Sequence, residues 1–270
     1  MKPGAFGSLD RLQQCTGLET LALKSSMAEE SDATAWVFNH TPAYGRVLGW
    51  LQNCSQLKDL AFWNIPCGSQ LLQGVLKSPD VRLVNLLYGT VEATVPWYTL
   101  LHHQTSLRDL DIKVYDSELQ NQGPVSGRCA GLAQGISQLP ELRRLMVNEY
   151  FSAKDVGTIS EGVRKLEIMS LDGTLIDDMY LEPIGKLPRL KELDVTGHSE
   201  FTSAGLLRFI KRLEKDPDGQ HRGFSLSISK QGIELNRDHE NHLRDQIKRG
   251  LKGSLYLEYI DSDGESYWNV

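Results

Sequence analysis

The chain lacks the features that mark membrane, secreted and nucleic-acid-binding proteins. Its apolar runs last only a few residues, as at Tyr98–Leu101, far below the roughly 20 needed to cross a bilayer. Four scattered cysteines in 270 residues form no disulfide framework, and the N-terminus shows no apolar signal segment. Lys and Arg number 29 against 35 Asp and Glu, so no basic excess indicates nucleic acid or anionic lipid. We therefore expect a cytoplasmic or nuclear protein that binds neither nucleic acid nor membrane.

No arrangement of reactive side chains predicts catalysis or a bound metal. Cys54 and Cys67 are 13 residues apart, which is not the spacing of a zinc site. His102 and His103 show no nearby third ligand, and the acidic segment Asp261–Glu265 fails the spacing of an EF-hand loop. No glycine-rich phosphate loop occurs. We expect reduced structural cysteines and a protein that is not an enzyme and holds no cofactor or metal.

The chain does contain a repeated apolar unit, L-x-x-L-x-L, in which L stands for any apolar residue. The unit starts at Leu18, Leu57, Val81, Leu107, Leu142, Leu166 and Leu190. The steps between starts are 39, 24, 26, 35, 24 and 24 residues, which fits one strand and one helix per unit with two insertions. Between units, stretches such as Gln70–Lys77 and Met179–Ile184 show apolar residues at helical spacing. The pattern predicts a strand followed by a helix, repeated along the chain.

This pattern resembles leucine-rich repeat proteins of the cysteine-containing, ribonuclease-inhibitor-like kind. Residues suited to a buried turn stand three positions ahead of most units, at Cys15, Cys54, Leu139, Val163 and Leu187. Ser78 and Gln104 depart from that rule. The resemblance implies an α/β fold: an open solenoid, or horseshoe, with a parallel sheet on the concave face and helices on the convex face. We expect a single domain over 1–270, with an N-terminal cap at 1–14, regular repeats at 15–200, and degenerate repeats and a cap at 201–270.

The later half is also similar to the repeat region of fungal F-box proteins. The likeness is carried by Ile176–Asp178, Leu187–Leu193, Phe201–Ile210 and Arg222–Ile228. It implies an alternative function, substrate recognition in an SCF-type ubiquitin ligase, in which the partner is a ubiquitination substrate. Only 17 residues precede the first unit, too few for an F-box, so that function would need an F-box on a longer product or on another chain.

After Val195 the period loosens. Thr202–Glu214 and Asp238–Arg249 show the apolar spacing of helices, while Phe224–Ile228 and Leu255–Tyr259 alternate like strands. A repeat array must cover the exposed end of its core with atypical units. We expect these segments to form two closing repeats.

A candidate binding surface follows from the alternation of side chains along each strand. The inner apolar residues of each unit point into the core, so the residues between and beside them point to the open face. The predicted partner-binding residues are Trp63, Leu83, Leu87, Asp109, Asp111, Arg144, Met146, Asp172, Glu192 and Asp194. Outward aromatic, Met and Arg side chains are typical of interface cores, and the acidic flank favours a partner with Lys or Arg beside an apolar residue. We expect a monomeric, non-catalytic interaction scaffold for a protein partner.

The alternative is that long insertions fold over these side chains and bury them. The insertions at 24–53 and 114–131 are long enough to cover a sheet face, chiefly through Ala28–Val47 and Asp116–Gly131. In that case Trp63 would belong to the core, and its truncation would change stability rather than partner binding.

Overall fold

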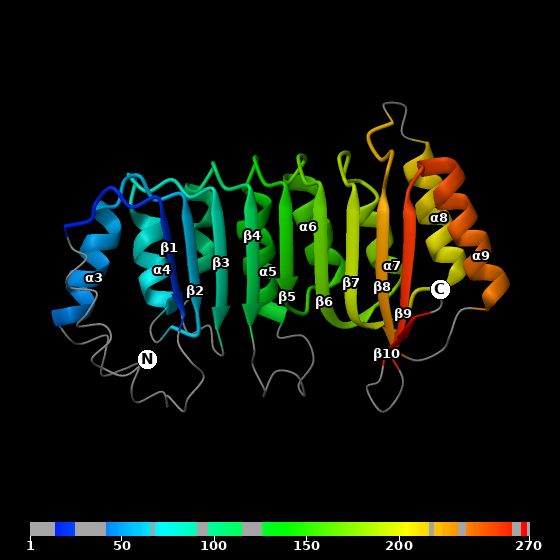
Figure 1. Cartoon of the computed structure of the whole chain (residues 1–270), viewed down its shortest axis with the longest axis horizontal. Helices are drawn as coiled ribbons and strands as arrows, with labels where there is room; N and C mark the ends of the chain where they lie inside the picture. Colours follow the sequence, from blue (N-terminus) through cyan, green and yellow to red (C-terminus); the bar gives the residue numbers. More distant parts are fainter. Residues whose placement is uncertain are drawn as a thin grey trace. The chain divides into compact units, whose positions relative to one another are not determined.

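The computed structural model describes residues 14–24, 42–65, 68–90, 97–114, 126–215, 219–231, 236–260 and 266–268. The whole chain is drawn in Figure 1. It divides into two compact units, Met1–Gln122 and Gly123–Val270. The expected N-terminal cap lies outside the described residues except for Gln14.

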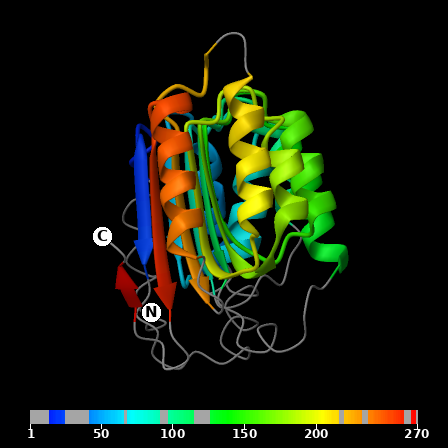
Figure 2. The same cartoon turned by 90° about the vertical axis from the view of Figure 1, so that its right-hand side faces the viewer.

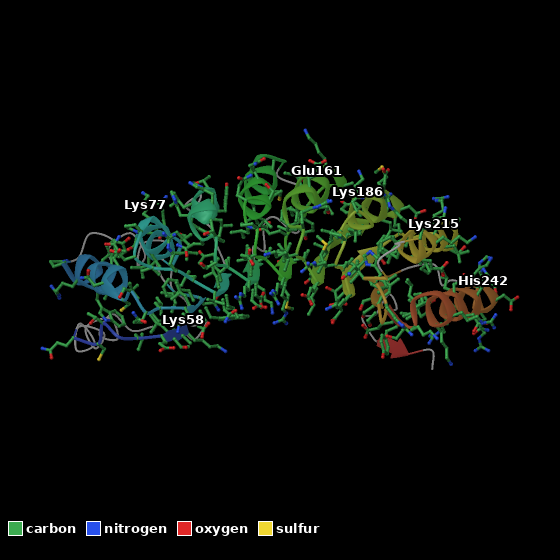
Figure 3. All side chains as sticks on the ribbon, turned by 90° about the horizontal axis from the view of Figure 1, so that it is seen from above. Lys58, Lys77, Glu161, Lys186, Lys215 and His242 are labelled. Atoms are coloured by element: carbon green, nitrogen blue, oxygen red, sulfur yellow. The ribbon has the colours of Figure 1, made fainter. Side chains whose placement is uncertain are left out.

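The first unit alternates strands with helices, as the repeat predicts. Its elements are β1 (Thr20–Lys24), α3 (Pro42–Asn53), β2 (Asp59–Trp63), α4 (Gly68–Lys77), β3 (Asn85–Thr90), the 3₁₀ helix η2 (Trp97–His103) and β4 (Asp109–Val114). The four strands pair in parallel and in chain order, which aligns Leu21, Leu60 and Leu86 across the sheet. The helices form a layer of their own on one side of the strands (Figure 3).

The second unit continues the same alternation. It contains α5 (Ser126–Ser137), β5 (Arg144–Asn148), α6 (Ala153–Gly162), β6 (Ile168–Ile176), α7 (Asp178–Ile184), β7 (Glu192–Ser199), α8 (Ser203–Glu214), β8 (Ser225–Gln231), α9 (Arg237–Gln246), the π-helical turn η4 (Ile247–Leu251), β9 (Ser254–Ile260) and β10 (Ser266–Trp268). Strands β5 to β9 are parallel, and its helices cover one face of the sheet (Figure 2). Strand β10, which the sequence pattern did not predict, pairs antiparallel with β9.

The core lies between the sheet and the helices of each unit. Leu110 and Leu145 occupy inner positions of the repeat and are fully buried, as expected. The two closing helices and strands also form where predicted. Helix α8, for example, is capped by Thr202, whose Oγ1 accepts a hydrogen bond from the Gly205 N–H at 3.0 Å. The fold class is therefore α/β, with open parallel sheets alternating with helices.

The third repeat starts two residues later than the sequence indicated. Strand register pairs Leu60 with Leu86 and Phe62 with Tyr88, so the unit begins at Leu83 rather than at Val81. Leu83 is fully buried, and its predicted place on the open face was wrong. Seven residues, 78–84, separate α4 from β3, whereas five, 54–58, separate α3 from β2. The apolar pattern allowed both registers because Val81 in the longer loop is buried as well.

The two polar residues that depart from the turn rule, Ser78 and Gln104, both bond to backbone groups. Gln104 is fully buried; its Oε1 accepts from the Leu83 N–H at 2.9 Å, and its Nε2 donates to the Val81 carbonyl at 3.2 Å. Ser78 donates to the carbonyl of Gln52 at 3.2 Å. The Gln104 side chain thus satisfies two backbone groups of the longer loop, and Ser78 satisfies a carbonyl in the last turn of α3.

The cysteines at the turn position differ from each other. Cys54 is buried as predicted, but Cys15 is exposed, and the prediction of a buried turn at Cys15 was wrong. Cys15 precedes β1, the end strand of its sheet, and within the described residues no earlier strand exists to cover it.

Helix α3 lies inside the segment 24–53, which the sequence pattern predicts to be an insertion. Its first residue is Pro42, a position where proline is favoured because the missing N–H has no partner there. Residues 42–47 of the segment Ala28–Val47, which the alternative interpretation places over the sheet face, therefore belong to the helical layer, where α3 packs on α4. The rest of the segment Ala28–Val47, residues 28–41, lies outside the described residues. Residues 116–125 of the second insertion segment, Asp116–Gly131, lie outside them as well. None of the described helices has the length and apolar character needed to span a membrane.

Candidate functional site

The open face of the first unit presents three rows of side chains that run across its strands. We name them the acidic row (Thr20, Asp59, Asn85, Asp109), the middle row (Ala22, Ala61, Leu87, Asp111) and the aromatic row (Lys24, Trp63, Gly89, Lys113). Four predicted site residues, Trp63, Leu87, Asp109 and Asp111, therefore share this face.

In the aromatic row, the indole of Trp63 lies on the backbone of Gly89. A Cβ atom at Gly89 would stand 2.9 Å from Cε3 of the indole, closer than real Cβ contacts come, so glycine permits this contact. The Nζ atoms of Lys24 and Lys113 each lie 5.7 Å from the ring centroid, within the range of a cation–π interaction. The result is a partly exposed aromatic platform flanked by two ammonium groups.

The acidic row holds one carboxylate in a fixed position. Thr20 Oγ1 donates to Asp59 Oδ2 at 3.0 Å, and Asn85 Nδ2 donates to Asp59 Oδ1 at 2.5 Å. Between the two charged rows, Lys113 Nζ lies 3.7 Å from the carboxylate of Asp111. The two carboxylates of the acidic row thus lie where the strands begin, and the two ammonium groups of the aromatic row lie where the strands end.

The open face of the second unit carries the other five predicted residues that reach an open face. Arg144 and Met146 lie on β5, Asp172 on β6, and Glu192 and Asp194 on β7. Arg144, Asp172 and Glu192 are exposed, while Met146 and Asp194 are partly exposed.

Further along the same face, the outward side chains are mainly hydroxyls and carboxylates. Ser170 Oγ donates to Asp194 at 3.1 Å, and Ser229 Oγ donates to Glu258 at 2.6 Å. Tyr256 is 55% exposed and was missed as a site residue, although the alternation Leu255–Tyr259 already placed it outward.

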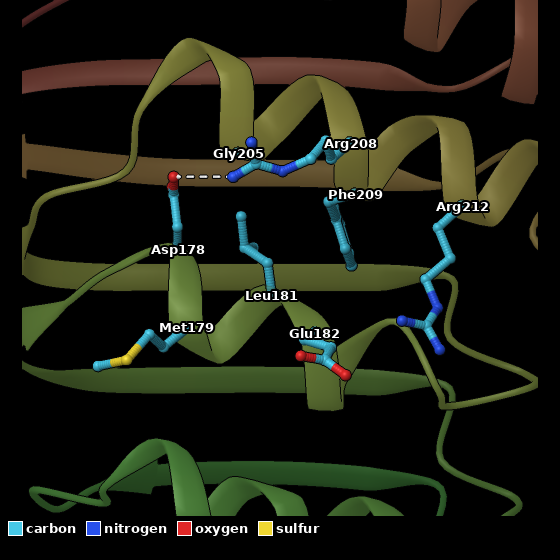
Figure 4. A pocket seen from close by; sticks show the side chains of 8 residues that line it. All are labelled: Asp178, Met179, Leu181, Glu182, Gly205, Arg208, Phe209 and Arg212. Carbon is cyan, nitrogen blue, oxygen red and sulfur yellow. Dashed lines mark ion pairs between the residues drawn. The ribbon is translucent and has the colours of Figure 1, made fainter.

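A hollow of about 360 Å³ lies on the helical side of the second unit, between α7 and α8 (Figure 4). Its apolar floor includes Leu181 and Phe209, and Met179 beside it is 66% exposed. The Asp178 carboxylate accepts from Thr202 N–H at 2.9 Å and lies 3.6 Å from Arg208. Asp178 therefore holds Thr202, the residue that caps α8, in place, which is a structural role.

Burial raises the pKa of two side chains, Cys54 and Tyr180. Burial, with a smaller contribution from Cys15, raises the pKa of the Cys54 thiol and keeps it protonated. Burial, then the charges of Asp177 and Asp155, raises the pKa of Tyr180. Its hydroxyl donates to the carbonyl of Phe151 at 2.8 Å. Within the described part of the chain, no three His, Cys, Asp or Glu side chains gather in a way that could hold a metal ion.

The structure thus brings four predicted site residues together in the first unit and five in the second, and it buries Leu83. No protein-family model matches the chain, and a search of curated proteins gives no significant match.

The sequence analysis missed three features of this site: Lys24, Gly89 and the position of Lys113 over Trp63. The strand register that aligns them is not visible in a single repeat unit.

Proposed function

We propose that the chain is a leucine-rich repeat solenoid of the ribonuclease-inhibitor-like kind, which works as a non-catalytic scaffold and binds a protein partner on the open face of its first unit. The proposal for the fold family is supported by parallel strands whose inner apolar residues align from repeat to repeat. The buried turn residue Cys54 supports it further.

The observation that carries the binding proposal is the partly exposed indole of Trp63. Tryptophan is enriched among residues that dominate binding energy in protein interfaces, where it fills a desolvated site at the centre of the contact. Here the indole is held in place by Gly89 below and by Lys24 and Lys113 on its flanks. Leu87 and Ala61 add apolar surface beside it.

A sheet face also suits binding on physical grounds. Parallel strands hold their side chains on a rigid frame, so little conformational entropy is lost when a partner binds. The side chains that would have to be ordered, Trp63 and Asp59, are already held by neighbouring residues.

The proposal is tested by affinity capture from the source cell with the wild-type chain and two variants. Trp63→Ala removes the platform, and we expect it to weaken capture of the partner by about 2 kcal/mol or more. Tyr98→Ala, a partly exposed aromatic on the helical side of the same unit, is the matched control and should leave capture unchanged.

Both variants must keep the wild-type melting temperature for the comparison to hold. A Trp63→Ala protein that captures the same partners as wild type contradicts binding at this face. Recovery of a cullin adaptor together with the partner would instead support the ubiquitin-ligase alternative.

A further inference from the structure

We infer that the partner segment bound at the first unit is bipolar: a basic side chain meets the acidic row, an acidic side chain meets the aromatic row, and an apolar side chain lies between them. This inference rests on the proposed function, since it names the chemistry of the partner at that same face. It extends the expectation of a partner with Lys or Arg beside an apolar residue by adding an acidic side chain.

The cationic end of the site is formed by two lysines that flank one ring. Within the described residues Lys24 makes no ion pair, and its ammonium lies 5.7 Å from the centroid of Trp63. Lys113 lies at the same distance from the ring and 3.7 Å from Asp111, longer than a direct hydrogen bond. A partner carboxylate placed beside the indole would therefore meet two ammonium groups and one carboxylate, with a net attraction.

The acidic row forms the anionic end of the site and can accept a cationic side chain of the partner. The row contains Asp59 and Asp109 and no basic residue. Thr20 and Asn85 both donate to Asp59, which fixes its carboxylate, and neither donor carries a charge. Lys58, the nearest lysine in sequence, is paired with Glu19 at 3.1 Å. A Lys or Arg of the partner would supply the missing positive charge.

The spacing of the rows sets the spacing of the partner's side chains. Successive rows are two residues apart along each strand, so the acidic and aromatic rows are about 13 Å apart. An extended segment places residues i, i+2 and i+4 on one face at the same interval. The segment that fits has opposite charges four residues apart and an apolar residue midway, which would lie over Ala61 and Leu87. Its direction along the strands decides which charge comes first.

Charge complementarity distinguishes this face from that of the second unit. There, Asp172, Glu192 and Asp194 are joined by Ser170 and Ser227, and among the side chains described on β5 to β9 the outward cation is Arg144, which shares its row with Glu192. The first unit instead gathers two lysines in one row and two carboxylates in another, so each end of a bipolar segment meets two groups of opposite charge there.

The inference is tested with synthetic peptides on the full chain. Three extended probes carry Leu midway between two charged residues four positions apart: one Arg with one Glu, two Glu, or two Arg. Fluorescence anisotropy at low salt should show that the Arg/Glu peptide binds wild type at least tenfold tighter than the other two. Its affinity should fall as salt is raised, because the contacts are exposed charges.

A charge reversal sharpens the test. Lys24→Glu/Lys113→Glu should lose at least tenfold in affinity for the Arg/Glu peptide and should prefer the two-Arg peptide. Lys77→Glu/Arg82→Glu makes the same change in net charge on exposed residues away from the open face and should bind like wild type. Both double variants are first checked for an unchanged melting temperature.

The outcomes separate the inference from the proposed function. Peptides that bind in a Trp63-dependent way with no preference among the three charge patterns overturn the bipolar partner and leave binding at this face intact. If no peptide binds and Trp63→Ala also leaves partner capture unchanged, both proposals are overturned. A doubled mass in light scattering that disappears in Lys24→Glu/Lys113→Glu would show that the occupant is a second copy of the chain, which also overturns the inference.

Discussion

The open faces of the two units differ in chemistry although the same repeat builds both. In the first unit, an indole lies on a glycine between two lysines, opposite a row of carboxylates. In the second, serines and carboxylates predominate, with Ser229 bonded to Glu258 and Ser170 to Asp194. The repeat dictates the inner positions because they must fill the core, and it leaves the outward positions free. The difference between the faces is therefore where specificity can reside.

The units are alike in how they tolerate an irregular turn. In the first, buried Gln104 bonds to two backbone groups of the lengthened loop before β3. In the second, His221 is 4% exposed, and its Nδ1 lies 2.8 Å from the carbonyl of Leu190. Each irregularity is accompanied by a buried polar side chain that pairs with backbone, since an unpaired buried group would be costly.

The largest expected effect tests whether the two cores are equivalent. Leu110→Ala in the first unit and Leu145→Ala in the second each remove a fully buried side chain between stacked repeats. Each should lower the free energy of unfolding by roughly 2–5 kcal/mol, measured by denaturant titration. A variant that unfolds at the wild-type denaturant concentration would show that its unit is not packed as described.

A second prediction compares the close approaches of glycine in the two units. A Cβ on Gly162 would overlap the backbone carbonyl of Ser137, which cannot turn away, whereas one on Gly74 would meet only the flexible side chain of Leu48. Gly162→Ala should therefore lose about 1–3 kcal/mol of stability, and Gly74→Ala less.

Gly157, in the same helix as Gly162, is the matched control because a Cβ there would come no nearer than 3.9 Å to Pro183. Gly157→Ala should be neutral or stabilise the protein by up to about 1 kcal/mol, as alanine favours a helix over glycine. Equal losses for the variants of Gly157 and Gly162 would rule out the backbone contact as the cause.

A third prediction concerns the polar turn residues. Gln104→Leu leaves the Leu83 N–H and the Val81 carbonyl buried without that partner, so it should cost about 1–3 kcal/mol. His221→Leu removes the contact with one carbonyl and should cost less. Thermal melts compare the two, and a Gln104→Leu protein as stable as wild type would show that the longer loop does not depend on this side chain.

The sequence predicted the structure best at the positions whose side chains form the core. The period predicted the strands and most helices, because an apolar residue in the wrong register would leave the core. It failed at Leu83, where a loop two residues longer kept Val81 buried as well and left two registers consistent with the pattern. It missed the lysine–tryptophan platform because three strands contribute to it, and only their mutual register places Lys24 and Lys113 beside Trp63.

The prediction with the smallest expected effect compares the ion pairs that lie at the strand starts of the two units. In the second, Glu167 accepts a hydrogen bond from Lys191 at 2.7 Å and lies 3.9 Å from Arg143. The bond to Lys191 is the main cause that lowers the pKa of Glu167, and the nearby charges of Lys191 and Arg143 add to it. In the first unit, Glu19 pairs only with Lys58 among the described residues.

A carboxyl group whose pKa is lowered by folding stabilises the protein above its unfolded pKa of about 4.3, and that contribution is lost as the pH falls through the lower, folded value. Glu167→Gln should therefore be less stable than wild type at pH 7, by no more than about 1 kcal/mol because the pair is exposed. The difference should shrink below pH 4 and in high salt. Glu19→Gln should show a smaller loss at pH 7. A Glu167→Gln difference of the same size at pH 3 and pH 7 would mean that the ionised carboxylate contributes nothing through these cations.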